Sequence, residues 1–392
     1  MPRNDSFDSF DSFDSFDSFD SFSARRSGSR SASALIRSRE GHLGRPQLLD
    51  ESGVKVSEFR PHLFRQWAVG LDGRHPNARN SPEDMPTPGT RWLDRMGSSR
   101  RIQIFLLDLM GRVSWAPMKA GWELQAPQIR LLFTRPGRSA FEHQVARVES
   151  WAALRSERSA EILSQIPIQW PYWSSVINLH PSRMPYTYEL LATAIEFASN
   201  LVQRLKYESV CPRPSDYSPR IQPMVDVPGH FSWPSGHATQ AFMVAELLTA
   251  LLLRADTQSG ESWFEMQQQL WRQAERIATN RVVAGLHFPI DNDAGCLLGI
   301  HAAHVIIDAA TGRPAPRTTV LASHAFGDPT GRQDFSFLPY LKACSRFRNL
   351  HHFDGEETHV PQVEASPPAA SERPVQWLWR QASAEWHGAG RL

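Results

Sequence analysis

Four consecutive segments with helical periodicity occupy the middle of the chain and constrain its fold more than any other feature. The first, residues 186–206, repeats apolar side chains three and four positions apart, as the buried stripe of a helix requires. The others are residues 238–254, 262–286 and 291–312, and the last begins with Asp and Asn cap residues and stops at Gly312. Because strand-like alternation is scarce, the sequence predicts an all-α fold built as a helical bundle.

The N-terminal segment predicts the opposite, a lack of fixed structure. Six Asp-Ser-Phe triplets fill residues 5–22, and a period of three matches neither a helix nor a strand. Each triplet puts a charge beside its only apolar residue, so no face of the segment can be buried. The sequence therefore predicts four parts: a disordered low-complexity tail (1–45), a helical and loop region that packs on the core (46–180), the helical core that carries the site (181–320) and a peripheral C-terminal extension (321–392).

Charge, cysteine content and hydropathy exclude several classes of protein. The chain has 42 basic and 41 acidic residues, which gives no electrostatic reason to bind nucleic acid. Its 3 cysteines are spaced too widely for a disulfide framework or a zinc site. The most apolar runs, 241–253 and 296–310, are too short to cross a bilayer and contain charged side chains. Because the N-terminus also lacks a secretory signal pattern, we expect a cytoplasmic protein without a membrane span.

Three short patterns of charged and polar residues lie at or near the ends of these helices. Their chemistry-bearing members are Lys206 and Arg213, then Ser235, Gly236 and His237, then Arg281, His287 and Asp291. Each pattern alone is more often a helix cap, a turn or a packed histidine than a site. Together, they predict a pocket for a tetrahedral oxyanion, because desolvating such an anion requires several fixed cations and donors.

The residue types suit such a pocket. Arg213 and Arg281 offer planar guanidinium groups to pairs of oxygens, and Lys206 adds a point charge. Ser235 offers a hydroxyl group, and Gly236 allows a close backbone N–H at a helix start, whose positive end favours an anion.

The three patterns resemble those of the superfamily that unites type 2 phosphatidic acid phosphatase (PAP2)-like acid phosphatases with vanadium-dependent haloperoxidases. That pattern reads K-x6-R-P, then P-S-G-H, then S-R-x5-H-x3-D, and this chain departs from it only at Asn280, where the family usually has serine. The resemblance covers residues 180–310 and implies a helical bundle of the PAP2/vanadium haloperoxidase type with the anion pocket at helix ends. Because asparagine still offers donors, we interpret Asn280 as a tuning difference.

The resemblance also implies a role for each histidine. His287 is the residue whose nitrogen bonds the central atom, as the nucleophile toward phosphorus or as the metal ligand to vanadium. Asp291 would hydrogen-bond the other ring nitrogen of His287, and His237 is the acid–base residue. His230 stands where bromide-oxidising members carry a histidine and chloride-oxidising members an aromatic residue.

Vanadate and phosphate have the same shape, so the pocket leaves two enzymatic functions open. The long chain without an expected membrane span, the aromatic residue before Pro234 and the presence of His230 favour a vanadate-dependent haloperoxidase. Its substrates would be hydrogen peroxide, bromide or iodide, and a small organic molecule, and related haloperoxidases suggest a homodimer. The alternative is a soluble PAP2-type acid phosphatase, which takes phosphate esters and forms a phosphohistidine intermediate. A non-catalytic oxyanion-binding scaffold is less favoured, because binding alone needs neither His237 nor His287.

Overall fold

The computed structural model describes residues 89–119, 121–127, 129–167, 169–255, 260–312, 319–322, 332–340 and 372–386. All of these except Gly89 belong to one compact unit, and they are called the described part of the chain below. The expected disordered tail over residues 1–45 lies outside the described part, as does most of the C-terminal extension.

Four long helices form the centre of this unit, which confirms the prediction of a helical bundle. They are α8 (Pro185–Ser209), α10 (Gly236–Ala255), α11 (Gly260–Val283) and α12 (Pro289–Thr311). Their bounds agree with the sequence to within a few residues. The helix α11 ends before the predicted residue 286, because Gly285 adopts a left-handed φ of 78° and turns the chain toward α12.

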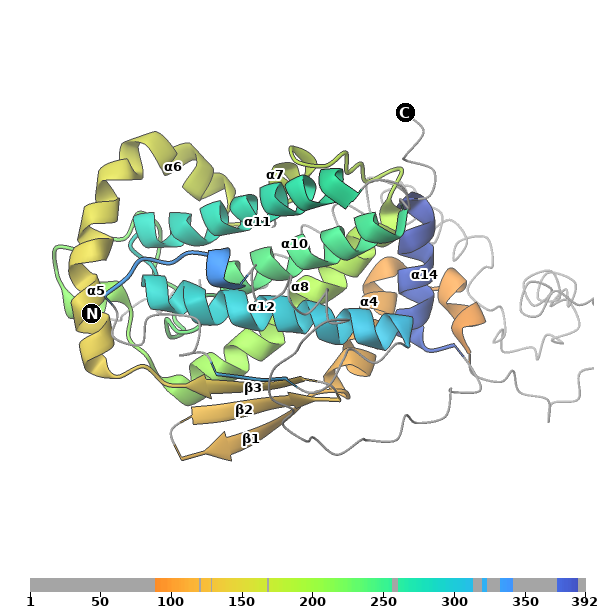
Figure 1. Ribbon diagram of the computed structural model, residues 1–392, viewed down its shortest axis with the longest axis horizontal. Helices are drawn as coiled ribbons and strands as arrows, with labels where there is room; N and C mark the ends of the chain where they lie inside the picture. Colours follow the sequence, from red (N-terminus) through yellow and green to blue (C-terminus); the bar gives the residue numbers. More distant parts are fainter. Residues whose placement is uncertain are drawn as a thin grey trace, which may run out of the picture. The chain divides into compact units, whose positions relative to one another are not determined.

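Shorter helices cover the two ends of the four-helix centre (Figure 1). They are η3 (Thr90–Arg95), α4 (Ser98–Met110), α5 (Arg138–Trp151), η4 (Ala152–Leu154), α6 (Arg155–Ser164), α7 (Trp170–Ser174), α9 (Pro214–Tyr217) and α14 (Pro374–Trp386). The helix α4 packs against α8, whereas α6 and α7 pack against α11.

The helix α10 is the central element, since it contacts α8, α11 and α12. Its closest neighbour is α12, which presents two glycines to it. A Cβ atom at Gly295 would lie 2.6 Å from the main-chain oxygen of Ser235, and one at Gly299 would lie 2.3 Å from that of Thr239. The absence of side chains at these two positions therefore sets how closely α12 approaches the beginning of α10.

A small sheet, which the sequence patterns did not reveal, lies beside the helices (Figure 1). Its strands are β1 (Ser114–Met118), β2 (Gly121–Ala126), β3 (Ile129–Thr134) and β4 (Thr319–Ala322), in that spatial order. The first three are antiparallel, with Leu124 opposite Leu131, and β4 pairs parallel to β3. The buried ring of Phe133 packs edge-on against Trp233 at 6.0 Å between centroids, so the sheet supports the segment that leads into α10.

The helix α14 packs into the same unit although it lies far along the chain. Its buried face includes Trp377, Leu378 and Trp379, and it contacts α8 and α12. The Glu385 carboxylate accepts hydrogen bonds from the backbone N–H groups of Tyr186 and Thr187, both at 2.8 Å. The C-terminal helix thus caps the first turn of α8. The division of the chain at residues 180 and 320 stays a prediction.

Two helices are long and apolar enough, by length and composition, to cross a membrane. The qualifying stretches are Gly236–Leu253 and Pro289–Thr311, and 67% and 78% of their respective windows are buried inside the protein. Such burial is also what the core helices of a soluble protein show.

Candidate active site

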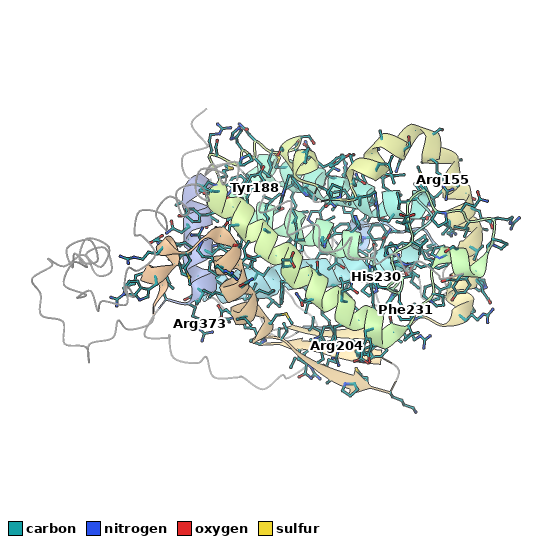
Figure 2. All side chains as sticks on the ribbon, turned by 180° about the vertical axis from the view of Figure 1, so that it is seen from behind. Arg155, Tyr188, Arg204, His230, Phe231 and Arg373 are labelled. Atoms are coloured by element: carbon teal, nitrogen blue, oxygen red, sulfur yellow. The ribbon has the colours of Figure 1, made fainter. Side chains whose placement is uncertain are left out.

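The three sequence patterns come together where several helices begin or end. Lys206 lies in the last turn of α8, Arg213 precedes α9, and Gly236 begins α10. Arg281 lies in the last turn of α11, and Asp291 lies in the first turn of α12. Figure 2 shows His230 and Phe231 toward the C-terminal end of α8, with Tyr188 near its beginning.

Lys206 is buried, and its ammonium group lies against the loop that precedes α10. The Nζ atom donates to the main-chain oxygens of Phe231 at 2.7 Å and Ser232 at 3.2 Å. It also lies 3.1 Å from Nδ1 of His230. The lysine therefore fixes the loop that precedes α10.

Arg213 links this loop to the beginning of α12. Its Nη1 atom donates to the main-chain oxygen of Leu286 at 2.9 Å and lies 3.0 Å from Nε2 of His287. Its Nη2 atom lies 3.0 Å from Nδ1 of His230. The same Nδ1 atom lies 3.2 Å from the main-chain oxygen of Phe231, so His230 sits within the network formed by the two cations and the loop before α10.

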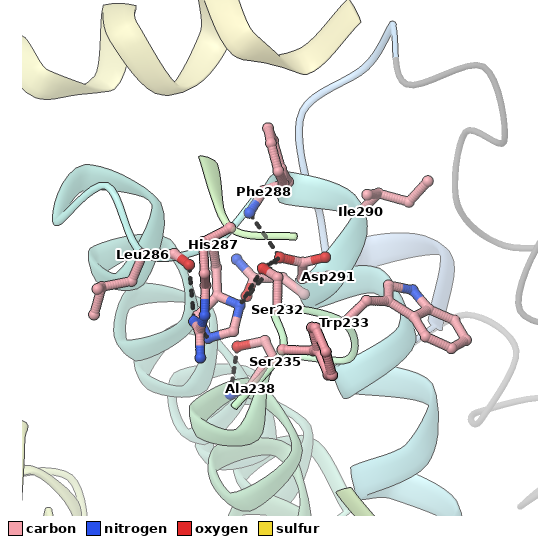
Figure 3. Close-up of polar contacts among 12 residues, drawn as sticks. Ser232, Trp233, Ser235, Ala238, Leu286, His287, Phe288, Ile290 and Asp291 are labelled. Carbon is pink, nitrogen blue, oxygen red and sulfur yellow. Dashed lines mark hydrogen bonds and ion pairs between the residues drawn. The ribbon is translucent and has the colours of Figure 1, made fainter. Parts of the chain in front are cut away.

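His287 and Asp291 form a buried pair, as the sequence spacing suggested (Figure 3). The Oδ2 atom of Asp291 accepts from Nδ1 of His287 at 3.1 Å, from the Ser232 hydroxyl at 2.5 Å and from the Phe288 backbone N–H at 2.9 Å. The proton of His287 is therefore on Nδ1, and Nε2 carries the lone pair. This is the tautomer that a nucleophile or a metal ligand at Nε2 requires.

Ser235 and Gly236 place the start of α10 at the same site. The Ser235 backbone N–H donates to the main-chain oxygen of Asp291 at 2.9 Å, which ties the starts of α10 and α12 together. Its hydroxyl accepts from the Ala238 N–H at 3.4 Å, as an N-cap residue does (Figure 3). A Cβ atom at Gly236 would meet only a Val202 methyl at 3.7 Å, so packing alone does not require glycine there.

His237 and Arg281 meet through a residue that the sequence patterns did not identify, Gln165. The Nε2 atom of His237 lies 3.1 Å from the main-chain oxygen of Gln165. The Nη2 atom of Arg281 donates to the side-chain oxygen of Gln165 at 3.2 Å and to the main-chain oxygen of Ile162 at 2.9 Å. Ser232 was also missed, because no spacing rule separates one serine of a loop from another.

Asn280, the departure from the family pattern, belongs to the same group of contacts. Its Nδ2 atom donates to the side-chain oxygen of Gln165 at 3.0 Å, and its Oδ1 atom accepts from Nη1 of Arg158 at 3.2 Å. A serine has one hydroxyl and could not span both partners in this way. Its interpretation as a tuning difference stays a prediction.

Burial shifts the pKa values of the site in a consistent direction, against the charged forms. It lowers the pKa of Lys206 well below its usual range, and the neighbouring Arg213 charge adds to this effect. Burial likewise lowers the pKa of His237 to about 3 and that of His230 to about 4. Burial raises the pKa of Asp291 to about 6, although its hydrogen-bond donors oppose the shift. An anion at this place would reverse the penalty on the cations.

Comparison with known proteins agrees with the resemblance in the motifs. No curated protein matches the chain. The model of the PAP2 superfamily matches residues 186–315, the segment that runs from the beginning of α8 to just past α12. This segment contains every residue of the three patterns, and they lie around one group of helix ends. The stretch 186–315 of this chain is therefore a PAP2-superfamily domain.

Proposed function

We propose that the protein is a vanadate-dependent haloperoxidase that oxidises bromide or iodide with hydrogen peroxide and passes the halogen to a small organic substrate. Membership of the PAP2 superfamily supports an enzyme of the phosphatase or haloperoxidase kind. The choice between the two reactions is the proposal.

The side chains of the site fit a tetrahedral oxyanion such as vanadate. Within the described part of the chain, the side-chain hydrogen bonds of Lys206 and Arg213 go to main-chain oxygens and histidines rather than to carboxylates. Arg281 keeps a buried Nε atom that has no hydrogen-bond partner. Buried donors without an anionic partner are costly unless a ligand accepts from them, so this cluster suits a multiply charged oxyanion.

The observation that carries the proposal is the position of His230. Its Nδ1 atom lies 3.1 Å from Nζ of Lys206 and 3.0 Å from Nη2 of Arg213, so a third histidine belongs to the group of cations. Phosphoryl transfer is served by a nucleophile and an acid, which His287 and His237 already provide. A further histidine beside the cations is what the resemblance links to bromide-oxidising enzymes.

Each residue then has a defined task. Lys206, Arg213, Ser235, Gly236 and Arg281 would hold the oxygens of vanadate, and Nε2 of His287 would be its single protein ligand. Vanadate, when bound, supplies a Lewis acid that activates hydrogen peroxide toward attack by halide without a change in its own oxidation state. Asp291 keeps the proton of His287 on Nδ1, and His237 moves a proton at the edge of the site.

Loading with vanadate tests the proposal. Purified protein is incubated with vanadate and assayed for bromination of a phenolic dye with bromide and peroxide. We expect vanadate-dependent bromination that falls by about 100-fold or more in His287→Ala, since the metal ligand is lost. His304→Ala is the matched control, because His304 lies on α12, the helix that His287 precedes, and contacts Glu246 instead of the site. Phosphomonoesterase activity without vanadate-dependent bromination would overturn the proposal.

The second candidate is an acid phosphatase with phosphate esters as substrates, and the state of His287 favours it. Burial and the nearby cations lower the pKa of His287 well below its usual range, so the ring is neutral and its Nε2 lone pair can attack phosphorus. The attack would form the P–N bond as the bond to the leaving oxygen breaks. His237 would deliver the proton for that oxygen from Nδ1, which would be protonated once the bound anion offsets the cost of burying the charged ring. A phosphohistidine trapped in the parent protein and absent in His287→Ala would support this reaction.

The cellular setting is part of the proposal. We propose a cytoplasmic homodimer, in line with the mostly buried apolar helices α10 and α12. Sedimentation of the purified protein without detergent tests both points, since aggregation or a monomer would contradict them.

A further inference from the structure

Gln165 lies in the turn that follows α6, before the segment matched by the PAP2 model, yet it contacts three residues within that segment. It is fully buried, and each of its polar groups has a partner. Its backbone N–H donates to the main-chain oxygen of Glu161 at 3.0 Å, and its side-chain nitrogen donates to the Glu161 carboxylate at 3.1 Å. Its side-chain oxygen accepts from Asn280 and Arg281.

These partners fix the orientation of the side-chain amide. The Nδ2 atom of Asn280 and the guanidinium of Arg281 can only donate, whereas the Glu161 carboxylate can only accept. Only one of the two amide orientations satisfies all of them, so the oxygen must face Arg281. Glu161 is itself held by Arg276, with the shortest contact at 2.7 Å.

The main chain of the same residue determines the proton position of His237. A carbonyl oxygen accepts only, so Nε2 of His237 carries the proton and donates to Gln165. The other ring nitrogen, Nδ1, is then the one with the lone pair. The main-chain oxygen of Gln165 also accepts from the side-chain nitrogen of Gln169 at 3.0 Å, and this contact holds the carbonyl in place.

We infer that Gln165 is a positioning residue of the active site: its side chain orients the Arg281 guanidinium toward the oxyanion, and its main-chain oxygen selects the tautomer of His237. The inference rests on the proposed oxyanion site, and holds for either reaction. The glutamine explains how Asn280 fits at the place of the usual serine, because its Nδ2 atom shares the acceptor that Arg281 uses.

The test compares Gln165→Met with Gln169→Met. Methionine has about the same length as glutamine and no amide, and Gln169 is a buried glutamine of the same turn that contacts neither Arg281 nor Asn280. Binding of inorganic phosphate and of vanadate is measured by calorimetry. We expect the dissociation constants to rise about tenfold in Gln165→Met, the effect of one charge-assisted hydrogen bond, and less than about twofold in Gln169→Met.

A second measurement reads the tautomer of His237 directly. Histidine labelled with nitrogen-15 gives distinct ring shifts for the two tautomers, and the His237→Gln variant identifies the signal. We expect a single Nε2–H tautomer in the parent protein and also in Gln165→Met, because the substitution keeps the main-chain oxygen that accepts from His237. If Gln165→Met does not fold, Asn280→Ala replaces it, and we expect about a two- to threefold loss of affinity because one neighbour of the amide is removed.

The outcomes distinguish a failure of the proposed oxyanion site from a failure of the role given to Gln165. A parent protein that binds neither anion contradicts the proposed function, while the tautomer measurement still tests Gln165. Normal anion binding in Gln165→Met overturns the role of the Gln165 side chain, and an Nδ1–H tautomer of His237 in the parent protein overturns the role of its main-chain oxygen.

Discussion

At the scale of single residues, one oxygen atom determines how the nucleophilic or metal-binding histidine is presented. Three donors converge on Oδ2 of Asp291, from His287, Ser232 and the Phe288 backbone. The Phe288 contact fixes the carboxylate to the helix start, so the side chain is both a helix cap and the partner of His287. The orientation of His287 therefore depends on local helix geometry.

Replacement of this carboxylate tests that dependence. We expect Asp291→Asn to reduce oxyanion affinity or turnover by about 10- to 100-fold, because an amide no longer enforces the Nδ1–H tautomer. Asp293→Asn is the control, since Asp293 is buried in the same turn but accepts from Tyr340, away from the pair. Anion binding by calorimetry measures the effect, and equal affinities in the two variants would contradict the role given to Asp291.

At the scale of elements, the site depends on how closely α12 approaches α10. The two glycines of α12 face Ser235, which directly precedes α10, and Thr239 in the first turn of that helix. The starts of the two helices are further joined by the bond from Ser235 N–H to the Asp291 oxygen. A change in helix spacing would therefore separate the donors on α10 from the histidine before α12.

The glycine contacts predict a sensitive position. We expect Gly299→Ala to destabilise the protein by about 1–3 kcal/mol, because the new methyl group would overlap the backbone of Thr239. Gly97→Ala is the control, since nothing lies within 4 Å of a Cβ atom there. Urea unfolding monitored by tryptophan fluorescence provides the comparison, and an equal midpoint for both variants would show that the helices tolerate a wider spacing.

The capping of α8 by the C-terminal helix gives a second prediction at this scale. We expect Glu385→Gln to lower the free energy of unfolding by about 1–2 kcal/mol, since a charged acceptor at a helix start is weakened. Glu372→Gln should cost less than about 0.5 kcal/mol, because its ion pair with Arg380 is exposed to solvent. Thermal unfolding distinguishes them, and a larger loss in Glu372→Gln would contradict the capping role.

At the scale of the whole molecule, the core buries several ionisable groups in a chain whose net charge is only +1. Burial lowers the pKa of four histidines, namely His230, His237, His287 and His301. Burial raises the pKa of two aspartates, Asp291 and Asp308, to about 6. The folded protein thus keeps these groups neutral at a pH where the unfolded chain would charge them.

These shifts predict how stability depends on pH. Between about pH 6.5 and pH 4 the unfolded chain binds protons on four histidines that the folded protein leaves neutral, while the folded protein binds protons on two aspartates first. As the pH falls, the shifted histidines therefore decrease the free energy of unfolding, and the shifted aspartates increase it. The pKa values of Glu189 and Glu275 are also raised, whereas those of Glu123, Glu161 and Glu372 are lowered. Because seven of these groups lose stability on acidification and four gain it, we expect a net loss, seen as a falling urea midpoint in phosphate-free buffer. A midpoint that rises toward pH 4 would contradict the burial of the histidines.

Much of the domain was predictable because its signals are local. The apolar periodicity gave α8, α10 and α12 to within a few residues, and the spacing of His287 and Asp291 placed both on one side of a helix start. The short strands, of five or six residues over β1 to β3, were not predicted, because each is too brief for alternation to stand out. The contact of α14 with α8 joins residues almost 200 positions apart, and no local pattern reports such a pairing.

The sequence by itself determined the helical bundle, the membership of residues 186–315 in the PAP2 superfamily and the set of cations and histidines that point to an oxyanion. Only the tertiary structure decided that Gln165 and Ser232 belong with them, and which nitrogen of His237 and of His287 carries the proton. The physical reason is that a sequence motif shows only which residue types are present, and binding an oxyanion requires particular residue types. A tautomer or an amide orientation depends on which acceptor or donor the fold brings within about 3 Å.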